Sequence, residues 1–161
     1  MATDIGIGSP FPPVRGHTLE GKEVKIPASS FGLVTLVVLV FARAAQGQVD
    51  SWIHPFEREL CHERGFMYYE VPMIASTWGR MFSGVIDAGM RAGTDPAVHP
   101  HVVTYYGDYG MYASILALEN SSMCYPFLLD KGGIVRWRSE GQAGHGSLEE
   151  LISLARMLQA E

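Results

Sequence analysis

The sequence predicts an α/β fold in which a mixed β-sheet is flanked by helices. Residues 35–41 form a continuous apolar run rich in β-branched side chains, which is typical of a strand buried on both faces. Directly after it, residues 48–64 repeat apolar side chains at helical spacing. Near the C-terminus, strand-like segments at 125–130 and 134–139 flank a tight turn and precede an amphipathic helix. Parallel strands joined by helices and followed by an antiparallel pair predict a mixed sheet.

Composition restricts the class of protein. The 161 residues are predicted to form one domain, 1–161, and a hydrophobic content of 47% is enough for a sizeable core. The net charge of −5 gives no basic surface for nucleic acid and no polybasic anchor for a membrane. The longest apolar run, 33–42, is too short to span a bilayer, so no stable membrane insertion is expected. No secretory signal is visible. The chain is expected to be soluble and cytoplasmic, or to lie in the mitochondrial matrix if it is a processed form.

Turn residues organise the N-terminal part. Residues 1–13 are rich in Gly and Pro and predict an irregular lead-in. In 14–26, apolar residues alternate on both sides of the turn dipeptide Glu20–Gly21, which predicts a short β-hairpin. The loop 27–32 then leads into the central strand.

The segment after the central strand is predicted as a helix followed by a second strand. The helix at 48–64 is expected to end at Gly65 and to kink at its interior proline, Pro55. The strand at 66–71 follows, and Pro72 is expected to stop it because proline lacks the N–H that a strand ladder needs.

The second half of the chain is less regular. Ser76 can cap a second amphipathic helix that ends by Gly93. Residues 94–123 are predicted as an insert, within which 111–118 is either a short helix or an extended segment. Residues 147–150 read Ser-Leu-Glu-Glu, a capping box that predicts the start of the closing helix.

Two segments carry a resemblance to a known superfamily. They are Val38-Leu-Val-Phe-Ala42 and Tyr125-Pro-Phe-Leu-Leu-Asp-Lys-Gly-Gly-Ile-Val-Arg-Trp137. Together with the order of elements, they resemble the thioredoxin fold with the N-terminal hairpin of thioredoxin-like redoxins and peroxiredoxins. The resemblance covers the chain from about Phe11 to the C-terminus. It implies that the Tyr125–Pro126 bond is cis.

The turn after the central strand departs from the redoxin pattern. The resemblance places Gln46 and Val49 at the positions of the two redox cysteines. Dithiol exchange needs one thiolate to attack and a second thiol to resolve the mixed disulfide, so this turn cannot perform it. The Thr and Cys of a peroxiredoxin turn are absent as well. The chain therefore resembles a redoxin scaffold that has lost its dithiol chemistry.

Several further segments carry a narrower resemblance. They are Phe11-Pro-Pro-Val-Arg-Gly-His-Thr-Leu-Glu-Gly-Lys-Glu-Val24, Val49-Asp-Ser-Trp-Ile-His-Pro-Phe56, Tyr105-Tyr-Gly107, Phe127-Leu-Leu-Asp130 and Ile134-Val-Arg-Trp137. They resemble the ATP synthase assembly-factor family of the Atp-ten type, which has a redoxin-like fold without Cys-x-x-Cys. This resemblance implies a non-enzymatic assembly or chaperone role for a membrane ATP synthase subunit, with no cofactor.

The resemblance also implies a protein or an extended peptide as the partner. In redoxin folds, the loop at the cis-proline pairs with an extended peptide through main-chain hydrogen bonds, a form of strand addition. The expected binding residues therefore lie at the turn, on the helix after it and at the proline loop. They are Ala45, Gln46, Gln48, Trp52, Tyr125 and Pro126.

The two cysteines leave an enzymatic alternative open. Cys124 directly precedes Tyr125, and Cys61 lies beside the apolar stripe of the predicted helix, where His62 and Arg64 could lower its pKa. Either thiol could serve a thiol-dependent oxidoreductase or peroxidase, and two packed, unreactive thiols are the simpler interpretation. A disulfide between them is not expected. It needs two Cα atoms within about 7 Å of each other, and the position of Cys61 within the predicted helix makes such an approach to Cys124 improbable.

Two other features suggest further hypotheses. Pro100 favours an extended backbone at His99, which would place the imidazoles of His99 and His101 on one side as a weak alternative metal site without a third ligand. The insert is also rich in tyrosine, a residue enriched at interfaces, which suggests an exposed aromatic surface and self-association into a homo-oligomer. The tyrosines are Tyr105, Tyr106, Tyr109, Tyr112 and Tyr125.

Overall fold

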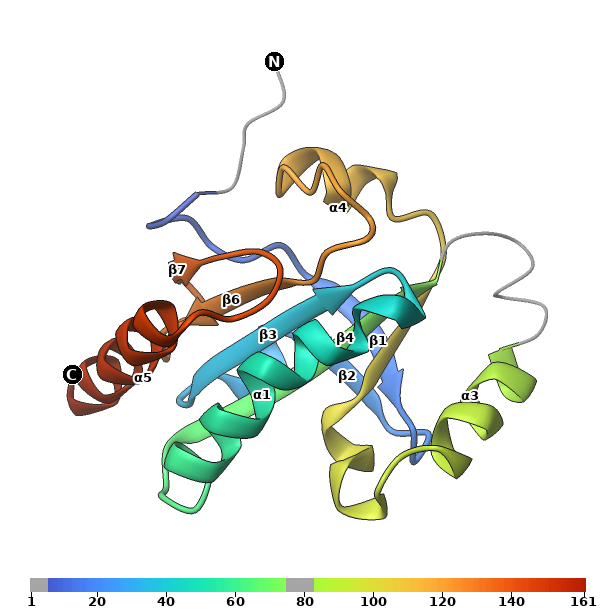
Figure 1. The fold of residues 1–161 in the computed structure, drawn as a ribbon, viewed down its shortest axis with the longest axis horizontal. Coiled ribbons are helices and arrows are strands. Elements are labelled where there is room, and N and C mark those ends of the chain that lie inside the picture. Colours follow the sequence, from blue (N-terminus) through green and yellow to red (C-terminus); the bar gives the residue numbers. More distant parts are fainter. Residues whose placement is uncertain (1–5, 75–82) are drawn as a thin grey trace.

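The computed structural model describes residues 6–74 and 83–161 and contains a seven-stranded mixed sheet flanked by helices (Figure 1). The strands are β1 Val14–Thr18, β2 Glu23–Ile26, β3 Val34–Val40, β4 Phe66–Ile74, β5 Val103–Tyr106, β6 Tyr125–Leu129 and β7 Val135–Arg138. Their order across the sheet is β2-β1-β5-β4-β3-β6-β7. The predicted fold class is confirmed.

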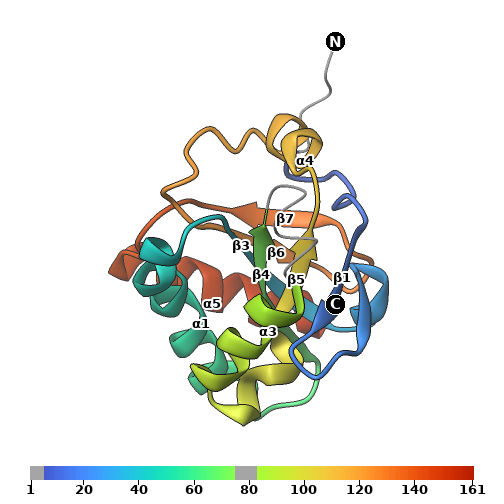
Figure 2. The same cartoon turned by 90° about the vertical axis from the view of Figure 1, so that its right-hand side faces the viewer.

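Helices and short 3-10 turns connect and cover these strands. The helices are α1 Gln46–Leu60, α3 Ser83–Ala92, α4 Gly110–Ile115 and α5 His145–Ala160, and the 3-10 turns are η1 Ala28–Ser30, η2 Arg43–Ala45 and η3 Pro96–His101. Figures 1 and 2 show α1 and α5 along one face of the sheet, while α3 lies beyond its β1–β5 side. Among the described residues, no helix combines the length and the apolar character that crossing a bilayer requires.

The strand β3 is the centre of the sheet. It pairs in parallel with β4 and antiparallel with β6, and all seven of its residues are buried. Leu36 points to the face covered by α1 and α5, whereas Val37 points to the other face, where Phe11 and Tyr112 pack. Burial on both sides explains why this strand reads as an uninterrupted apolar run rather than an alternating one.

The predicted hairpin is present and extends the sheet. β1 and β2 pair antiparallel, with Val14 opposite Ile26. β1 also pairs with β5, so the hairpin becomes one edge of the sheet. Gly16 permits this close approach, because a Cβ there would lie 2.5 Å from the main-chain oxygen of Thr104.

Two predicted boundaries around α1 and β4 were wrong. The helix runs from Gln46 to Leu60 instead of 48–64, because the chain leaves the helix in a turn that ends at Gly65, which has a positive φ of 101°. Pro55 lies inside the helix as predicted. Pro72 does not stop the second strand, which continues to Ile74. Pro72 stands opposite the last residue of β3, so its missing N–H falls at the end of that ladder.

The later elements also refine the prediction. The segment with two predicted alternatives contains the helix α4. The closing helix starts at His145, two residues before the predicted capping box, because Ser147 occupies its third position and exchanges hydrogen bonds with the main chain of Gly144. The second helix ends at Ala92 as expected, whereas its predicted cap, Ser76, lies outside the described residues.

The expected cis bond was placed wrongly. In the described part of the chain the cis peptide bond is Ile26–Pro27, and Tyr125–Pro126 is not cis. Pro126 instead belongs to the β3–β6 ladder, where it stands opposite Val38. A trans bond keeps Tyr125 and Pro126 in one extended strand, which explains the difference from the redoxin pattern.

Candidate functional site

The candidate site is the corner, which comprises residues 43–49 and the loop 119–124 that leads into β6. β3 ends at Val40, η2 turns the chain, and α1 begins at Gln46. Since β6 pairs antiparallel with β3, the start of β6 lies beside the end of β3. The fold therefore brings the two parts of the corner together, although they are far apart in the sequence.

Gln48 joins the two parts of the corner. Its Oε1 atom accepts a hydrogen bond from the main-chain N–H of Cys124 at 2.9 Å. Its Nε2 atom donates to the carbonyl oxygen of Ser122 at 3.3 Å. The side-chain amide thus bonds to the main chain on both sides of Met123.

Gln46 binds two carboxylates at the start of α1. Its Nε2 atom lies 3.0 Å from Oδ1 of Asp50 and 3.1 Å from Oε1 of Glu70. Burial raises the pKa of the Glu70 carboxyl, the Gln46 hydrogen bond opposes that rise, and the charge of Asp50 adds to it while His54 lowers it. Gln46 therefore stabilises the charged form of a carboxylate that burial disfavours.

The six predicted binding residues divide into two groups. Gln46 is exposed and Gln48 is half-buried, so both present polar atoms at the surface of the corner. Ala45, Trp52, Tyr125 and Pro126 are buried, and their side chains belong to the core beneath it. Sequence reasoning missed Asn120, Ser122 and Glu70, of which only the Asn-x-Ser spacing of the first two is a recognisable turn signal.

Cys124 lies in the corner but is fully buried. Its Sγ atom lies 3.5 Å from the carbonyl oxygen of Gly141, to which it donates. Burial raises the pKa of the thiol to about 12, although hydrogen bonds from main-chain groups oppose the rise, and the charge of Glu70 adds to it. At neutral pH this group is a thiol and not a nucleophilic thiolate.

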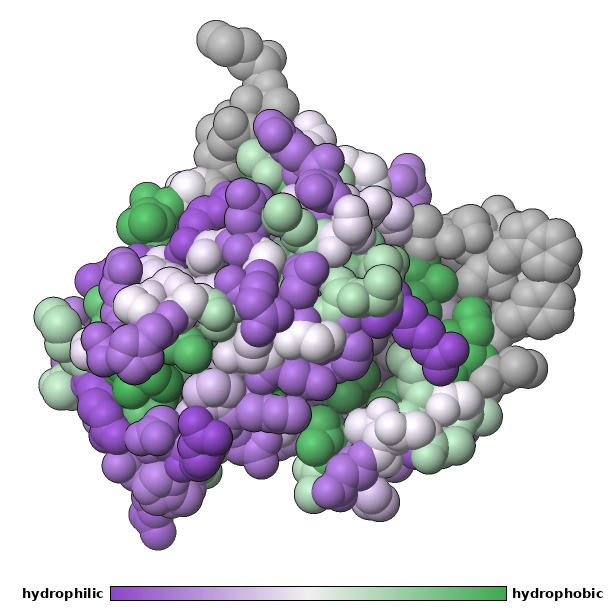
Figure 3. Space-filling model, in the orientation of Figure 1, coloured by the Kyte–Doolittle hydropathy of each residue, from purple (hydrophilic) through white to green (hydrophobic). Residues whose placement is uncertain are grey.

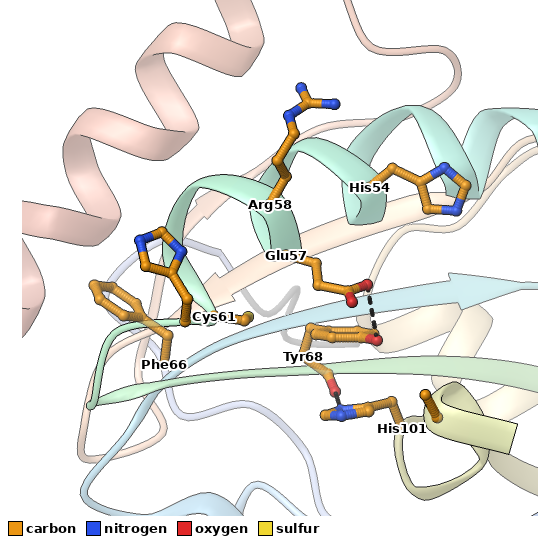
Figure 4. Close-up of a pocket in the computed structure, with 9 residues that line it drawn as sticks. His54, Glu57, Arg58, Cys61, Phe66, Tyr68 and His101 are labelled. Atoms are coloured by element: carbon orange, nitrogen blue, oxygen red, sulfur yellow. Dashed lines mark hydrogen bonds between the residues drawn. The ribbon is translucent and has the colours of Figure 1, made fainter. Parts of the chain in front are cut away.

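Cys61 lies at the other end of α1, in the wall of a cavity of about 630 Å³ (Figure 4). Burial, followed by the charge of Glu57, raises the pKa of this thiol to about 12 as well. A helical rise of about 1.5 Å per residue places Cys61 roughly 20 Å from Gln48, which contacts Cys124. Both cysteines are free, and this separation excludes a disulfide between them in the folded chain.

The cavity is formed by α1, β4 and η3. It is lined by His54, Glu57, Arg58, Cys61, His62, Phe66, Tyr68, Ala97 and His101. Figure 4 shows the Tyr68 hydroxyl directed at Glu57, to which it donates at 3.2 Å. The His101 ring stacks on Tyr68 with centroids 4.0 Å apart, and its Nδ1 atom bonds to the Tyr68 carbonyl oxygen at 2.9 Å. These contacts hold η3 against the sheet.

The predicted pairing of His99 and His101 was wrong. Both belong to η3, a 3-10 helix, and not to an extended segment, because Asp95 caps the turn by accepting from the N–H of Ala97. His99 bonds to the carbonyl oxygen of Thr94 at 3.0 Å, whereas His101 bonds to Tyr68. Across 6–74 and 83–161, no three His, Cys, Asp or Glu side chains are placed to hold a metal ion.

None of the five tyrosines expected to form an exposed aromatic surface is fully exposed: two are buried and three are half-buried. Tyr112 is buried and donates to the carbonyl oxygen of Pro13 at 2.7 Å. Tyr109 is half-buried against Phe41, with ring centroids 4.8 Å apart. Met111 beside them is 59% exposed. Self-association through this surface remains a prediction.

Figure 3 shows hydrophilic residues over much of the exposed side of α1.

Comparison with solved structures identifies the fold. BsSco, a member of the Sco family of cytochrome c oxidase assembly proteins, has a TM-score of 0.66 and 11% identity, with 99% of this chain and 99% of BsSco covered. A thiol:disulfide interchange protein of the thioredoxin family from Chlorobium tepidum TLS has a TM-score of 0.57 and 14% identity, with 96% and 98% covered. A peroxiredoxin-like protein from Aquifex aeolicus has a TM-score of 0.59 and 11% identity, with 96% and 88% covered. At these identities the likeness shows the thioredoxin-like fold alone.

Sequence comparison identifies the family. No curated protein matches the chain. The family model described as ATP10 protein matches residues 9–158, which is nearly the whole chain and includes both parts of the corner. The narrower resemblance in the sequence is therefore confirmed, and the chain belongs to the ATP10 protein family.

Proposed function

We propose that this chain is a non-catalytic binding protein that acts as an assembly factor or chaperone for a membrane ATP synthase subunit. Membership of the ATP10 family supports a protein partner. The observation that carries the proposal is the corner itself. The resemblance to redoxins puts Gln46 and Val49 at the positions of the two cysteines, and the amide of Gln48 between them bonds to the loop before β6. Residues 43–49 contain no cysteine, so this turn can contact a partner but cannot perform dithiol exchange with it.

A thiol-dependent oxidoreductase or peroxidase is the second candidate, because both cysteines are free. The raised pKa values of Cys61 and Cys124 oppose it, since the thiolate is the reactive form. Insulin reduction and peroxide consumption test this candidate. Turnover above background that disappears in Cys124→Ser or Cys61→Ser would establish the enzyme and overturn the non-catalytic proposal.

Site-directed photocrosslinking tests the proposed partner. A photoreactive residue at Gln46, which is exposed in the corner, is expected to crosslink a membrane ATP synthase subunit in cells that assemble the synthase. The same residue at Met157, which is 65% exposed on the C-terminal half of α5, is the control. Mass spectrometry then identifies the adducts. Equal labelling from both positions, or adducts at Gln46 without any synthase subunit, would contradict the proposal.

A further inference from the structure

We infer that the cavity between α1, β4 and η3 is a binding site for the guanidinium group of an arginine side chain on a polypeptide partner, with the Glu57 carboxylate as its counter-charge. The cavity is lined by the last turn of α1, at the end of the helix opposite the corner, so it is a second contact surface. That the partner is a polypeptide rests on the proposed function. The choice of an arginine rests on the cavity alone.

The charges that line the cavity leave one carboxylate without a cationic partner. Three basic residues of the wall each lie near an acidic side chain that is not part of the lining. These pairs are His54–Asp50 at 3.7 Å, Arg58–Glu59 at 3.8 Å and His62–Glu63 at 3.9 Å. Figure 4 shows Arg58 extended away from Tyr68 and Glu57 extended towards it. Within 6–74 and 83–161, no basic side chain lies within 4.0 Å of the Glu57 carboxylate, so its charge is open to a cation from outside.

Tyr68 holds the Glu57 carboxylate in place without neutralising it. The hydroxyl of this buried tyrosine donates to Oε2 of Glu57 at 3.2 Å, while Oε1 bonds to no other side chain in the described part of the protein. Burial, followed by the charge of Glu57, raises the pKa of both Tyr68 and Cys61. The negative charge of Glu57 is therefore felt on two sides of the cavity.

His101 adds a second acceptor to the wall. Its Nδ1 atom bonds to the carbonyl oxygen of Tyr68, which can only accept, so Nδ1 carries the proton. In the neutral ring Nε2 is then an acceptor, and it bonds to none of the residues that the structure describes. The carbonyl end of α1 also carries a partial negative charge, which favours a cation beside the last turn.

These features fit a guanidinium group better than an ammonium group. A guanidinium has five N–H donors and no acceptor, pairs with a carboxylate through two parallel bonds and stacks on aromatic rings, whereas an ammonium is compact and strongly hydrated. Phe66 and Tyr68 supply aromatic surface. The volume of about 630 Å³ lies in the ordinary range of ligand clefts and leaves room for the residues beside the arginine. A net charge of −5 also favours the approach of a basic partner.

The test is an NMR titration of the full chain with tripeptides that are blocked at both ends and carry arginine, lysine or citrulline between two glycines. The arginine peptide is expected to bind saturably and to shift the amide signals of Tyr68 and His101. The citrulline peptide keeps the shape without the charge and is expected not to bind. Glu57→Gln is expected to weaken arginine binding about tenfold, because a charged pair becomes a neutral one. Glu150→Gln removes the same charge from an exposed position on α5 and should stay within about twofold of wild type.

Three results would each overturn the guanidinium site. They are an arginine peptide that does not bind saturably, a Glu57→Gln affinity equal to that of wild type, and a lysine peptide that binds as tightly as the arginine peptide. None of them changes crosslinking from Gln46, which tests the proposed function separately. Arginine binding that persists when Gln46 crosslinks no synthase subunit would uphold the cavity as a guanidinium site and overturn the proposed function alone.

Discussion

The indole N–H of Trp52 donates to the carbonyl oxygen of Gly141 at 2.7 Å, a contact between α1 and the loop that follows β7. The thiol of Cys124 donates to the same oxygen. The Trp52 ring also meets Trp137 edge-on, with centroids 5.3 Å apart. One carbonyl therefore joins the first turns of α1, the start of β6 and the segment before α5 directly beneath the corner.

Replacing Trp52 by Phe is expected to lower the free energy of unfolding by about 1–3 kcal/mol, because the buried Gly141 oxygen loses its short hydrogen bond and keeps only the weak thiol donor of Cys124. Urea denaturation measures this loss. Trp137→Phe makes the same change of ring in the same aromatic pair and separates ring packing from the Trp52–Gly141 hydrogen bond. Equal stability of Trp52→Phe and wild type would show that the bond contributes nothing.

Both thiols are expected to resist alkylation in the folded protein. A rise of the pKa from 9.0 to about 12 lowers the thiolate fraction at neutral pH about a thousandfold. Labelling with iodoacetamide should therefore be slow in buffer and rapid in urea, with Cys61→Ser and Cys124→Ser assigning each signal. A native rate above that of a free thiol peptide would favour the enzymatic candidate.

The sequence predicts the scaffold better than the site. The continuous apolar run identifies β3 because burial on both faces leaves a local signature. The contact between Gln48 and Cys124 joins residues 76 positions apart, and no local pattern encodes it. The prediction for Pro72 failed for a different reason. A local pattern marks proline as the end of a strand, whereas β4 tolerates Pro72 because its ladder with β3 already ends at this residue.

The resemblance to redoxins explains part of the error at the proline loop. It correctly places Pro126 beside the end of β3. The expected groove assumed that Tyr125 and Pro126 faced a ligand, whereas both are buried in β6. Burial depends on the packing of distant elements such as α4, so a motif alone cannot give it.

Alkaline pH is expected to destabilise the fold. Burial raises the pKa of Cys61, Cys124, Tyr68 and Tyr106 in the folded state. Between the unfolded and folded pKa values the unfolded chain binds fewer protons than the folded chain. These four groups therefore contribute their full stabilisation below about pH 9, and the free energy of unfolding falls as the pH rises further. Urea midpoints at pH 8, 9 and 10 measure the fall. Cys61→Ala and Cys124→Ala should each make the urea midpoint fall less steeply with pH. A midpoint that does not change between pH 8 and pH 10 would contradict the raised pKa values.

Glu70→Gln is expected to raise stability at neutral pH. Burial raises the pKa of this carboxyl above its ordinary value of 4.5, so the folded protein holds its proton to higher pH than the unfolded chain does. Stability is therefore lost as the pH rises from the unfolded-state pKa of Glu70 through its folded-state pKa. A neutral amide removes this loss while keeping an acceptor for Gln46. The gain should vanish below about pH 4, where Glu70 is protonated in both states. A gain that persists at pH 3 would point to packing instead of charge.

Asp87 is expected to be the main attachment of α3 to the sheet. It is 6% exposed, its Oδ2 atom lies 2.7 Å from Nε2 of His17 on β1, and its Oδ1 atom accepts from the Tyr106 hydroxyl on β5 at 2.5 Å. Arg91, one turn further along α3, adds a bond of 3.1 Å to the carbonyl oxygen of Leu19.

Asp87→Ala removes the two bonds to the sheet and is expected to cost roughly 1–3 kcal/mol in the free energy of unfolding. Because those bonds connect α3 to two strands, the amides of Ser83–Ala92 should lose protection against hydrogen exchange before those of β3 do. Glu150→Ala removes an exposed carboxylate from α5 and should leave both measurements unchanged. Uniform loss of protection across α3 and β3 would instead show that α3 opens only when the whole domain unfolds.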